Sequence, residues 1–275
     1  MSKLSGKIAL VSGSGRGIGR AIAMKLASEG ARLVINDLDA DPAQEVVEAI
    51  RAIGGEAIAC VGNVTAFDFG ERFVQSAVDA YGGIDIIVNN AGYTWDNVIQ
   101  KMSDEQWYAI MDVHMTAPFR VLRAAQPVIR AMSRAEQEAG REVYRKVVNI
   151  SSIAGLGGNA GQVNYSAAKA GIVGMTMALA KEWGRMKVNV NAVAFGLIKT
   201  RLTEASAAGN ATVNIEGRDI KVGVNPELMA MMEHSIPLGR AGTPEEAAGA
   251  VYLLCTPEAN YISGQTVTCG GGISI

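Results

Sequence analysis

A tyrosine and a lysine lie four positions apart in the segment YSAAK, residues 165–169, among small and apolar residues. On a helix this spacing places the side chains of Tyr165 and Lys169 on one face, within reach of the same bound molecule. A phenol has a reference pKa of about 10 and is a poor base near neutral pH. A nearby ammonium group favours the phenolate and lowers the pKa of the tyrosine. The pair therefore predicts proton transfer to or from an oxygen atom of a bound molecule.

A glycine-rich turn near the N-terminus indicates what else could be bound. The segment SGSGRGIG, residues 12–19, follows an apolar run and precedes a helical pattern. Glycines let the backbone approach a pyrophosphate group, which rests on the unpaired N–H groups of a helix N-terminus. Any tight turn between a strand and a helix also uses glycine, so the pattern is weak by itself. The residues expected to contact a dinucleotide here are Gly13, Ser14, Gly15, Arg16, Gly17, Ile18 and Gly19.

Asp37 ends the next apolar run, ARLVIND, and bears on which dinucleotide is bound. A carboxylate at this strand end can accept hydrogen bonds from ribose hydroxyls, and it repels a 2'-phosphate. The sequence therefore favours NAD, with contacts from Asp37 and Leu38. Arg16 indicates the opposite, because its side chain could meet a 2'-phosphate, and NADP is the alternative. Alternatively, Asp37 has no role in cofactor binding and only caps the following helix or faces solvent.

Two further strand ends carry small residues and amides, which allow a base and a ribose to lie close to the backbone. The third apolar run ends in GNVT and the fourth in NNAG. Asn89 and Asn90 could instead serve only to tie neighbouring loops together. The residues expected at the cofactor are Asn63, Val64, Asn90, Ala91 and Gly92.

Short β-branched runs alternate along the chain with amphipathic segments of helical length. Seven runs predict strands: KIALVSG, ARLVIND, EAIACVGNV, IDIIVNNAG, KVVNISS, VNVNAVAFG and GQTVTC. Helices are predicted at 18–28, 42–53, 67–81, 104–132 and 162–183. This alternation predicts one α/β domain over residues 1–275, a doubly wound parallel sheet with helices on both faces. Ligands of such sheets bind beyond the carboxyl ends of the strands, where the candidate residues are found.

Two stretches interrupt the alternation. The charged segment 133–146 is predicted to be a solvated extension of the preceding helix. The segment 203–237 is too long for a simple connection, and insertions of this length are often binding loops or lids. We therefore expect a substrate lid at about 201–237.

Composition narrows the class of partner. Of the 275 residues 49% are hydrophobic, and the formal net charge is -2 with both signs dispersed, which does not favour nucleic acid. Cys60, Cys255 and Cys269 lack the spacing of a metal site or a disulfide framework, so no metal is expected. No apolar run at the N-terminus is long enough for a signal peptide or a membrane span. We expect a cytoplasmic protein without membrane contact that binds a small-molecule substrate.

Five segments in order carry a resemblance to a known family: SGSGRGIG, NNAG, NISS, YSAAK and AFGLIKT. Over essentially its whole length the chain resembles a short-chain dehydrogenase/reductase. The resemblance implies a Rossmann-type fold, a nicotinamide cofactor and interconversion of a ketone and a secondary alcohol. Within the family the chain is similar to 3-oxoacyl-(acyl carrier protein) reductases and 3-hydroxyacyl-CoA dehydrogenases, so the expected substrate is a 3-oxoacyl thioester on acyl carrier protein or coenzyme A. A homotetramer is also implied.

The resemblance gives roles to individual residues. It places the catalytic serine at Ser152, thirteen residues before Tyr165, where its hydroxyl would stabilise charge on the substrate oxygen. Ser151 is the alternative, although strand alternation points it to the other side. Lys169 would also bind the nicotinamide ribose. His114 stands where the family has an asparagine that holds a water, and it could relay protons in the same way or only fill space.

Two smaller departures from the family pattern concern the cofactor. Asn63 replaces an aspartate that faces the adenine amino group, and Phe195 replaces a proline in the turn after the sixth strand. The residues expected to hold the carboxamide are Gly196, Ile198 and Thr200. Two other functions stay open, a dehydrogenase of a polyol, steroid or cyclic alcohol and a non-catalytic dinucleotide-binding scaffold.

Overall fold

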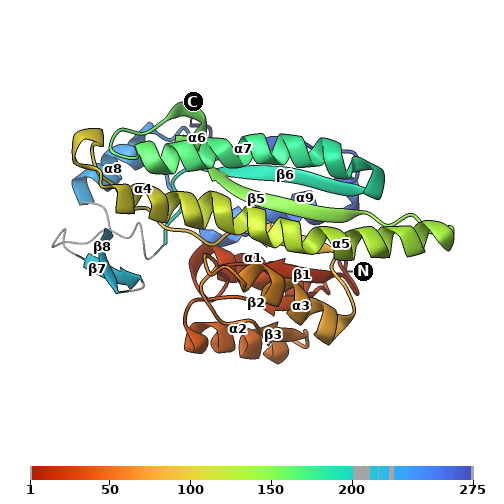
Figure 1. Ribbon diagram of the computed structural model, residues 1–275. Helices are drawn as coiled ribbons and strands as arrows, with labels where there is room; N and C mark the ends of the chain where they lie inside the picture. The colour runs from red at the N-terminus through yellow and green to blue at the C-terminus, as the bar shows by residue number, and fades with distance from the viewer. Residues whose placement is uncertain (1, 201–210, 216, 223–225, 274–275) are drawn as a thin grey trace.

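Seven parallel strands form one sheet in the order β3-β2-β1-β4-β5-β6-β9. The computed structural model describes residues 2–200, 211–215, 217–222 and 226–273 (Figure 1). The strands are β1 (Ile8–Val11), β2 (Arg32–Ile35), β3 (Ala57–Ala59), β4 (Ile86–Asn89), β5 (Arg145–Ser152), β6 (Val188–Phe195) and β9 (Thr266–Cys269). The seven predicted strands and the Rossmann-type α/β fold are confirmed.

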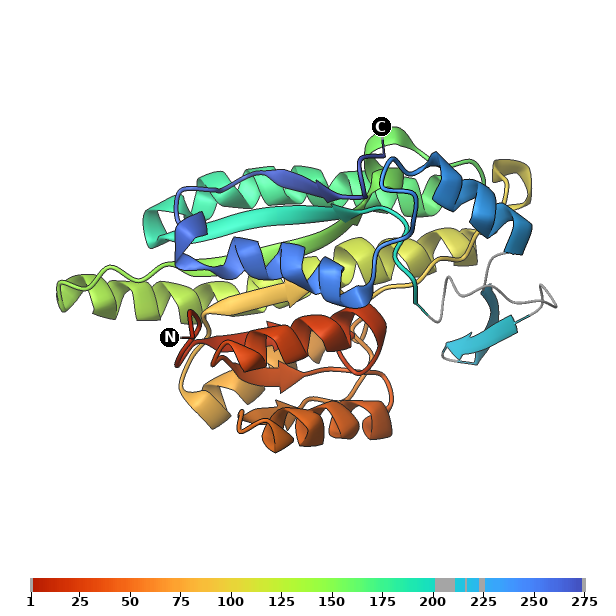
Figure 2. The same cartoon turned by 180° about the vertical axis from the view of Figure 1, so that it is seen from behind.

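Helices cover both faces of the sheet, as the views from the front and the back show (Figures 1 and 2). One face carries α1 (Gly17–Ser28), α2 (Ala40–Ala52) and α9 (Pro244–Cys255). The other carries α3 (Phe69–Tyr81), α5 (Ala117–Glu138) and α7 (Val163–Trp183). Shorter pieces are η1 (Ile99–Lys101), α4 (Asp104–Met111), η2 (Asp112–Thr116), α6 (Ile153–Gly157), η3 (Gly184–Met186) and η4 (Pro257–Ala259). Among the described residues, every helix is too short or too polar to cross a bilayer.

Two apolar clusters bury the faces of the sheet. Ile22 and Leu26 of α1 and Val251 of α9 pack against one face. Phe73 of α3 and Ile129 of α5 pack against the other. Because side chains alternate between the two faces, β1, β2, β4, β5 and β6 each contribute to both clusters, which explains why their sequences are almost continuously apolar.

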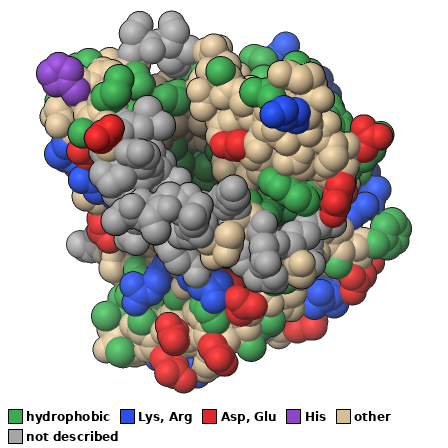
Figure 3. All heavy atoms as spheres, turned by 90° about the vertical axis from the view of Figure 1, so that its left-hand side faces the viewer, with side chains coloured by type: hydrophobic (Ala, Val, Ile, Leu, Met, Phe, Trp, Pro, Cys, Tyr) green, Lys and Arg blue, Asp and Glu red, His purple; other side chains and the backbone are tan. Residues whose placement is uncertain are grey.

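The order of the strands reverses at β1, which pairs with β2 on one side and with β4 on the other. The loops after β1 and β4 therefore diverge to opposite faces and leave a crevice at the carboxyl ends of the strands. This edge of the molecule is hollowed at its centre in the space-filling view (Figure 3). The candidate residues from the sequence lie on the loops that surround it.

The helix predicted at 104–132 is interrupted. The structure has α4, one π-helical turn at η2 and then α5, which continues to Glu138. A π-turn adds a residue to the helical repeat without changing the apolar pattern much, so periodicity does not reveal it, and such turns are often found at functional sites. The turn contains His114.

The prediction for residues 133–146 is wrong in its second half. The helix ends at Glu138, and Arg145 and Lys146 are buried at the start of β5. Arg145 pairs with Glu136 through two hydrogen bonds of 2.8 and 2.7 Å, and its Nε donates to Ile84 O. The cation is buried because α5 supplies a carboxylate that satisfies it.

The segment predicted as a lid contains regular structure in its described part. An antiparallel hairpin joins β7 (Ala211–Ile215) to β8 (Arg218–Val222), and α8 (Pro226–Ser235) follows. Residues 201–210, 216 and 223–225 of the predicted lid lie outside the described residues. Ile220 and Met229 are buried, whereas Met231 and Met232 are exposed.

Candidate active site

Tyr165 and Lys169 lie one turn apart at the N-terminal end of α7. The Lys169 Nζ atom is 5.5 Å from the centre of the Tyr165 ring. Lys169 is buried, and its ammonium group donates a 2.7 Å hydrogen bond to the carbonyl oxygen of Ile150 in β5. The four-residue spacing thus brings the two groups together at the carboxyl end of β5.

Burial controls the protonation of this pair. Desolvation raises the pKa of Tyr165 to about 12, a hydrogen bond with Ser152 acts in the opposite direction, and the charge of Asp96 adds to the increase. Desolvation also lowers the pKa of Lys169 to about 7. The pKa of Tyr165 is thus raised, whereas the sequence predicted that it would be lowered, because the loss of hydration is the largest contribution to it. The phenol is therefore protonated near neutral pH and suited to act as an acid.

Ser152 ends β5 and begins α6. Its hydroxyl oxygen accepts a 3.2 Å hydrogen bond from the Ala154 N–H and forms a side-chain hydrogen bond with Tyr165. Ser151 points to the other side of the strand, where its hydroxyl donates to the Lys169 carbonyl oxygen at 2.7 Å. Strand alternation therefore brings Ser152 to the phenol and uses Ser151 to fix the backbone of α7.

His114 lies in the π-turn η2, and its ring packs edge-to-face with the ring of Tyr165. The ring centroids are 5.1 Å apart at an interplanar angle of 86°. Its Nε2 lies 2.8 Å from the carbonyl oxygen of Tyr93, and Nδ1 is buried with no hydrogen-bond partner among the described residues. A carbonyl only accepts, so Nε2 carries the hydrogen and Nδ1 presents a lone pair. Burial, followed by the charge of Lys169, lowers the pKa of His114 well below its usual value, which keeps the ring neutral.

The glycine turn between β1 and α1 is shaped for close approach. Gly13 and Gly17 adopt positive φ angles of 61° and 52°. A Cβ atom on Gly13 would lie 2.8 Å from the Cα of Ala91, and one on Gly19 would collide with the Gly13 carbonyl oxygen. Arg16, the N-cap of α1, makes no side-chain cap. The N–H groups of the first turn and the space left by the glycines fit the pyrophosphate of a dinucleotide.

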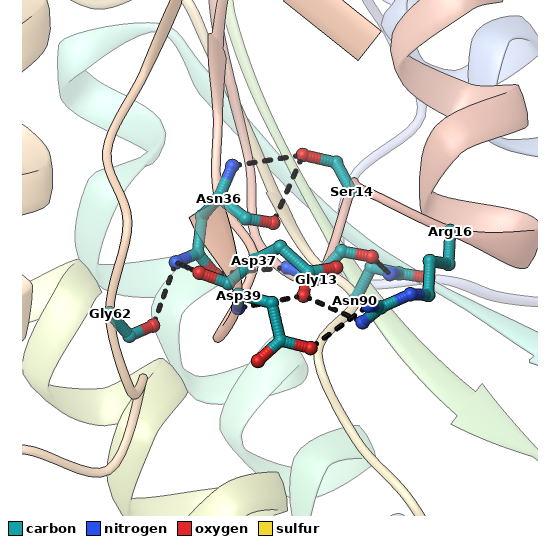
Figure 4. Close-up of polar contacts among 8 residues, drawn as sticks. All are labelled: Gly13, Ser14, Arg16, Asn36, Asp37, Asp39, Gly62 and Asn90. Atoms are coloured by element: carbon teal, nitrogen blue, oxygen red, sulfur yellow. Dashed lines mark hydrogen bonds and ion pairs between the residues drawn. The ribbon is translucent and has the colours of Figure 1, made fainter. Parts of the chain in front are cut away.

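Arg16 and Asp37, which indicated opposite cofactors, form an ion pair (Figure 4). The Arg16 Nη1 donates to Asp37 Oδ1 at 3.0 Å, and Nη2 donates to Asp39 Oδ2 at 2.9 Å. Asp37 is buried, and a side chain on Gly15 would collide with its carboxylate. The carboxylate therefore stands directly beside the glycine turn, and the arginine is held on it.

Asn36 connects three of these loops and was missed by the sequence analysis. Its Oδ1 accepts from the Gly13 N–H and its Nδ2 donates to the carbonyl oxygen of Gly62, both at 3.0 Å (Figure 4). The Nδ2 also donates to the Cys60 carbonyl oxygen at 3.0 Å. The amide thus fixes the turn after β1 to the ends of β2 and β3. The only sign of Asn36 in the sequence was that a polar residue precedes Asp37 at the end of the apolar run VIND.

Asn90 follows β4 and ties two loops together, whereas Asn89, the last residue of β4, donates to Asn149 Oδ1 of β5 at 2.8 Å. The Asn90 Nδ2 donates to the carbonyl oxygens of Ser12 and Gly13 at 3.0 Å, and the Ser12 hydroxyl accepts from the N–H groups of Asn90 and Ala91. Gly92 lies against the ring of His114, where a Cβ atom would collide. The loop after β4 therefore joins the glycine turn to the catalytic candidates.

The remaining cofactor candidates surround the same crevice. The Asn63 Oδ1, expected at the adenine, accepts bonds from the N–H and hydroxyl of Thr65 at 2.8 and 2.9 Å. Val64 lines a small cavity of about 10 Å³ together with Ser12 and Ala91. Leu38 is 40% exposed beside Asp37.

The loop after β6 reaches the glycine turn. The N–H of Gly196 donates to Cys269 O at 3.0 Å, and a Cβ atom on Gly196 would lie 2.8 Å from the Cα of Gly270. Phe195 is buried as the last residue of β6, and Ile198 forms a bridge with Gly242. The Cγ2 of Thr200 comes within 3.9 Å of a Cβ position on Gly17. The substitution of proline by Phe195 therefore leaves a loop that is pinned by β9.

Comparison with known proteins agrees with this arrangement. The family model described as "short chain dehydrogenase" matches residues 7–211. A 3-oxoacyl-[acyl-carrier-protein] reductase of Synechocystis sp. is 39% identical over 275 aligned residues, with 99% of each chain covered. Enzymes of that name from Vibrio cholerae and Aquifex aeolicus are 38% and 39% identical, with 98% of each chain covered. The chain belongs to the short chain dehydrogenase family and is an oxidoreductase that uses a nicotinamide cofactor.

Proposed function

We propose that the protein interconverts a 3-oxoacyl thioester and its 3-hydroxyacyl thioester. The observation that supports it is the meeting of Ser152, Tyr165, Lys169 and His114 beside the glycine turn. The relatives named above are 3-oxoacyl-[acyl-carrier-protein] reductases over nearly their full length. The proposed substrate is a small molecule, a 3-oxoacyl group carried on acyl carrier protein or coenzyme A.

Each side chain has a separate task in this reaction. The bound cofactor supplies or accepts the hydride. The Tyr165 hydroxyl gives its proton to the carbonyl oxygen during reduction, and the Ser152 hydroxyl donates a hydrogen bond to the same oxygen as charge develops on it. Lys169 would hold the nicotinamide ribose. The unpaired Nδ1 of His114 accepts a hydrogen bond from a water, which returns a proton towards Lys169.

We propose NAD as the preferred cofactor. The buried carboxylate of Asp37 beside Gly15 can accept the ribose hydroxyls and repels a 2'-phosphate. Arg16, which could have favoured NADP by binding its 2'-phosphate, forms ion pairs with Asp37 and Asp39 instead. The residues assigned to the cofactor are those predicted from the sequence, at the turn 13–19, at Asp37 and Leu38, at 63–64 and 90–92, at Tyr165 and Lys169, and at Gly196, Ile198 and Thr200.

The wider organisation is part of the same proposal. We assign residues 1–275 to one domain, with the segment 201–237 as a lid over the acyl chain. Met231 is 70% exposed on α8, and thioether side chains adapt to chains of different shape. We expect the enzyme to assemble as a homotetramer and to be located in the cytoplasm.

Substrate turnover tests the function. Purified protein would be assayed for oxidation of NADH and of NADPH with acetoacetyl-CoA and with acetoacetyl-acyl carrier protein. The proposal expects turnover with a thioester and faster turnover with NADH. Activity confined to a panel of polyols, steroids or cyclic alcohols with NAD would replace the thioester by such an alcohol. Cofactor binding without turnover of any compound in the panel would favour a dinucleotide-binding scaffold.

A further inference from the structure

A short segment after β4 crosses the N-terminal end of α7 beside the phenol. We name residues 93–97 the strap. The Tyr93 carbonyl oxygen accepts from His114, and the Trp95 carbonyl oxygen accepts from the Asn164 Nδ2 at 3.1 Å. The Asn97 N–H donates to Gly161 O at 2.9 Å. Contacts along its whole length thus fix the strap to the elements that carry the catalytic candidates.

The strap carries a carboxylate at Asp96. The Gln162 Nε2 donates to Asp96 Oδ2 at 2.7 Å, and a parallel β-bridge joins Asn97 to Gln162. Gln162 is itself held by Asn159, whose Nδ2 donates to Gln162 Oε1 at 2.9 Å. Gln162 is the N-cap of α7, three residues before Tyr165, so the carboxylate is fixed at the N-terminal end of the helix that carries the phenol.

Four described side chains contact the Tyr165 phenol or act on its pKa. Ser152 from β5 offers a neutral hydroxyl, and His114 from η2 is a neutral ring that packs edge-to-face with the phenol. Lys169 from α7 lies near the ring, and burial lowers its pKa to about 7. Asp96 from the strap is the carboxylate among them. The balance of charge at the phenol therefore depends on the strap.

We propose that Asp96 is a positioning residue whose carboxylate, held by Gln162, opposes release of the proton from the Tyr165 hydroxyl. A negative charge nearby favours the neutral form of an acid. Tyr165 is then kept as a proton donor, which favours reduction of the ketone and moves oxidation of the alcohol to higher pH. This inference rests on the proposed function, because it gives the site a preferred direction.

The electrostatics agree with the geometry. After desolvation and the opposing Ser152 hydrogen bond, Asp96 is the next contribution to the raised pKa of Tyr165. Desolvation raises the pKa of Asp96 itself, although the residue is exposed at the surface. Water at this surface screens the charge, so we expect an effect of about half a pH unit rather than several units.

The test removes the charge and keeps the shape. Asp96→Asn retains an oxygen that accepts from Gln162. The pH dependence of kcat/KM would be measured for oxidation of 3-hydroxybutyryl-CoA with NAD, and its rising limb is expected to move down by about half a pH unit. The matched control is Asp112→Asn, which removes an exposed carboxylate of η2 that accepts from Thr116. The control profile is expected to coincide with that of the wild type.

A second variant reports on the fixing of the carboxylate. Gln162→Met removes the donor to Asp96 at similar size, so its profile is expected to move in the same direction but less. The double variant is expected to match Asp96→Asn alone, since both changes act through one charge. A wild-type profile for Asp96→Asn, or an equal shift in the Asp112→Asn control, contradicts the proposal.

A readout independent of turnover separates this inference from the proposed function. The enzyme would be labelled with carbon-13 at the tyrosine Cζ and saturated with NAD, and the Tyr165 signal would be assigned by its loss in Tyr165→Phe. Titration of that signal is expected at lower pH in Asp96→Asn than in the wild type and in Asp112→Asn. If no thioester is turned over, the proposed function fails, and the NMR titration still decides the role of Asp96: equal titration points contradict it.

Discussion

Burial, rather than charge pairing, sets the chemistry of the residues that the YSAAK spacing brings together. The pKa of Tyr165 is raised to about 12 and that of Lys169 is lowered to about 7, in both cases mainly by desolvation. An ammonium group that is easily deprotonated can exchange protons near neutral pH, while the phenol beside it stays protonated. At the residue scale the site is thus prepared for donation of a proton to a ketone.

The buried Lys169 makes stability depend on pH. Its pKa is about 7 in the folded chain and about 10.5 when unfolded, so between these values the unfolded state binds more protons. The free energy of unfolding therefore rises with pH across this window. We expect Lys169→Met to be more stable than the wild type by about 3 kcal/mol at pH 6, and the difference to shrink towards pH 10. Urea denaturation of the cofactor-free proteins measures this, and a pH-independent difference would contradict it.

The ion pair between Arg16 and Asp37 predicts how cofactor preference can be changed. Asp37→Asn removes the charge that repels a 2'-phosphate and releases the arginine. The ratio of kcat/KM for NADPH to that for NADH is expected to rise at least about tenfold. Asp39→Asn is the control, because it removes the exposed partner of the same arginine and leaves Asp37 in place. An unchanged ratio in Asp37→Asn would show that another residue selects the cofactor.

Residue types and spacing indicated the candidates that touch ligands but not those that hold the loops. Tyr165 and Lys169 were found from a four-residue interval, and Asp37 from its place at a strand end. Asn36 and Asn164 were not found, because an amide that bonds to backbone groups has no fixed partner in the sequence. Asn164 is fully buried and bonds to Trp95 O, Gln106 O and the Tyr165 N–H. Its importance depends on three segments meeting in space.

At the scale of elements, strands were predictable and helix boundaries were less so. Buried parallel strands need continuous apolar runs, so the central strands were recognised from composition, whereas the exposed edge strand β9 was recognised from its β-branched residues. The helix over 104–132 was not divided correctly, because the π-turn at η2 leaves the apolar pattern intact. The start of β5 was misread since charged residues normally indicate a solvated surface, whereas Arg145 is satisfied by a carboxylate nine residues earlier.

The pairing of α5 with β5 predicts a large cost for losing one partner. Glu136→Gln leaves the buried Arg145 guanidinium without its carboxylate and is expected to destabilise the fold by about 3 kcal/mol. Glu138→Gln, in the exposed pair with Arg134 on the same helix, is expected to cost less than about 0.5 kcal/mol. Chemical denaturation at neutral pH compares the two variants. Equal costs would show that the buried pair contributes no more than the surface pair.

At the scale of the whole molecule, the reversal of strand order at β1 sends the loops after β1 and β4 to opposite faces at the carboxyl ends of the strands. The first loop is the glycine turn, and the second continues into the strap, which bonds to the start of α7. This arrangement follows from parallel pairing and short connections, so it could be expected from strand and helix alternation. The β7–β8 hairpin could not be expected in this way, because the segment 203–237 was interpreted as a lid and no strands were assigned to it. Hairpin pairing depends on contacts that its short strands alone do not specify.

Exposed apolar side chains on α5 and α7 are consistent with the expected homotetramer. Phe119 and Met177 are 47% and 48% exposed on these helices. The double variant Phe119→Glu with Met177→Glu is expected to shift the sedimentation coefficient to that of a smaller assembly, because charges are costly at an apolar interface. Ile53→Glu, at the exposed end of α2, is expected to leave the assembly unchanged. A wild-type sedimentation coefficient for the double variant would place the contacts elsewhere.

The most direct test of the account compares wild type and Tyr165→Phe with acetoacetyl-CoA in the presence of NADH or NADPH. The wild type is expected to oxidise NADH, whereas the variant should still bind the cofactor but lose about three orders of magnitude in kcat. Turnover by the variant at the wild-type rate would contradict the assignment of Tyr165 as the proton donor. The account would then require another acid at the carboxyl ends of the strands.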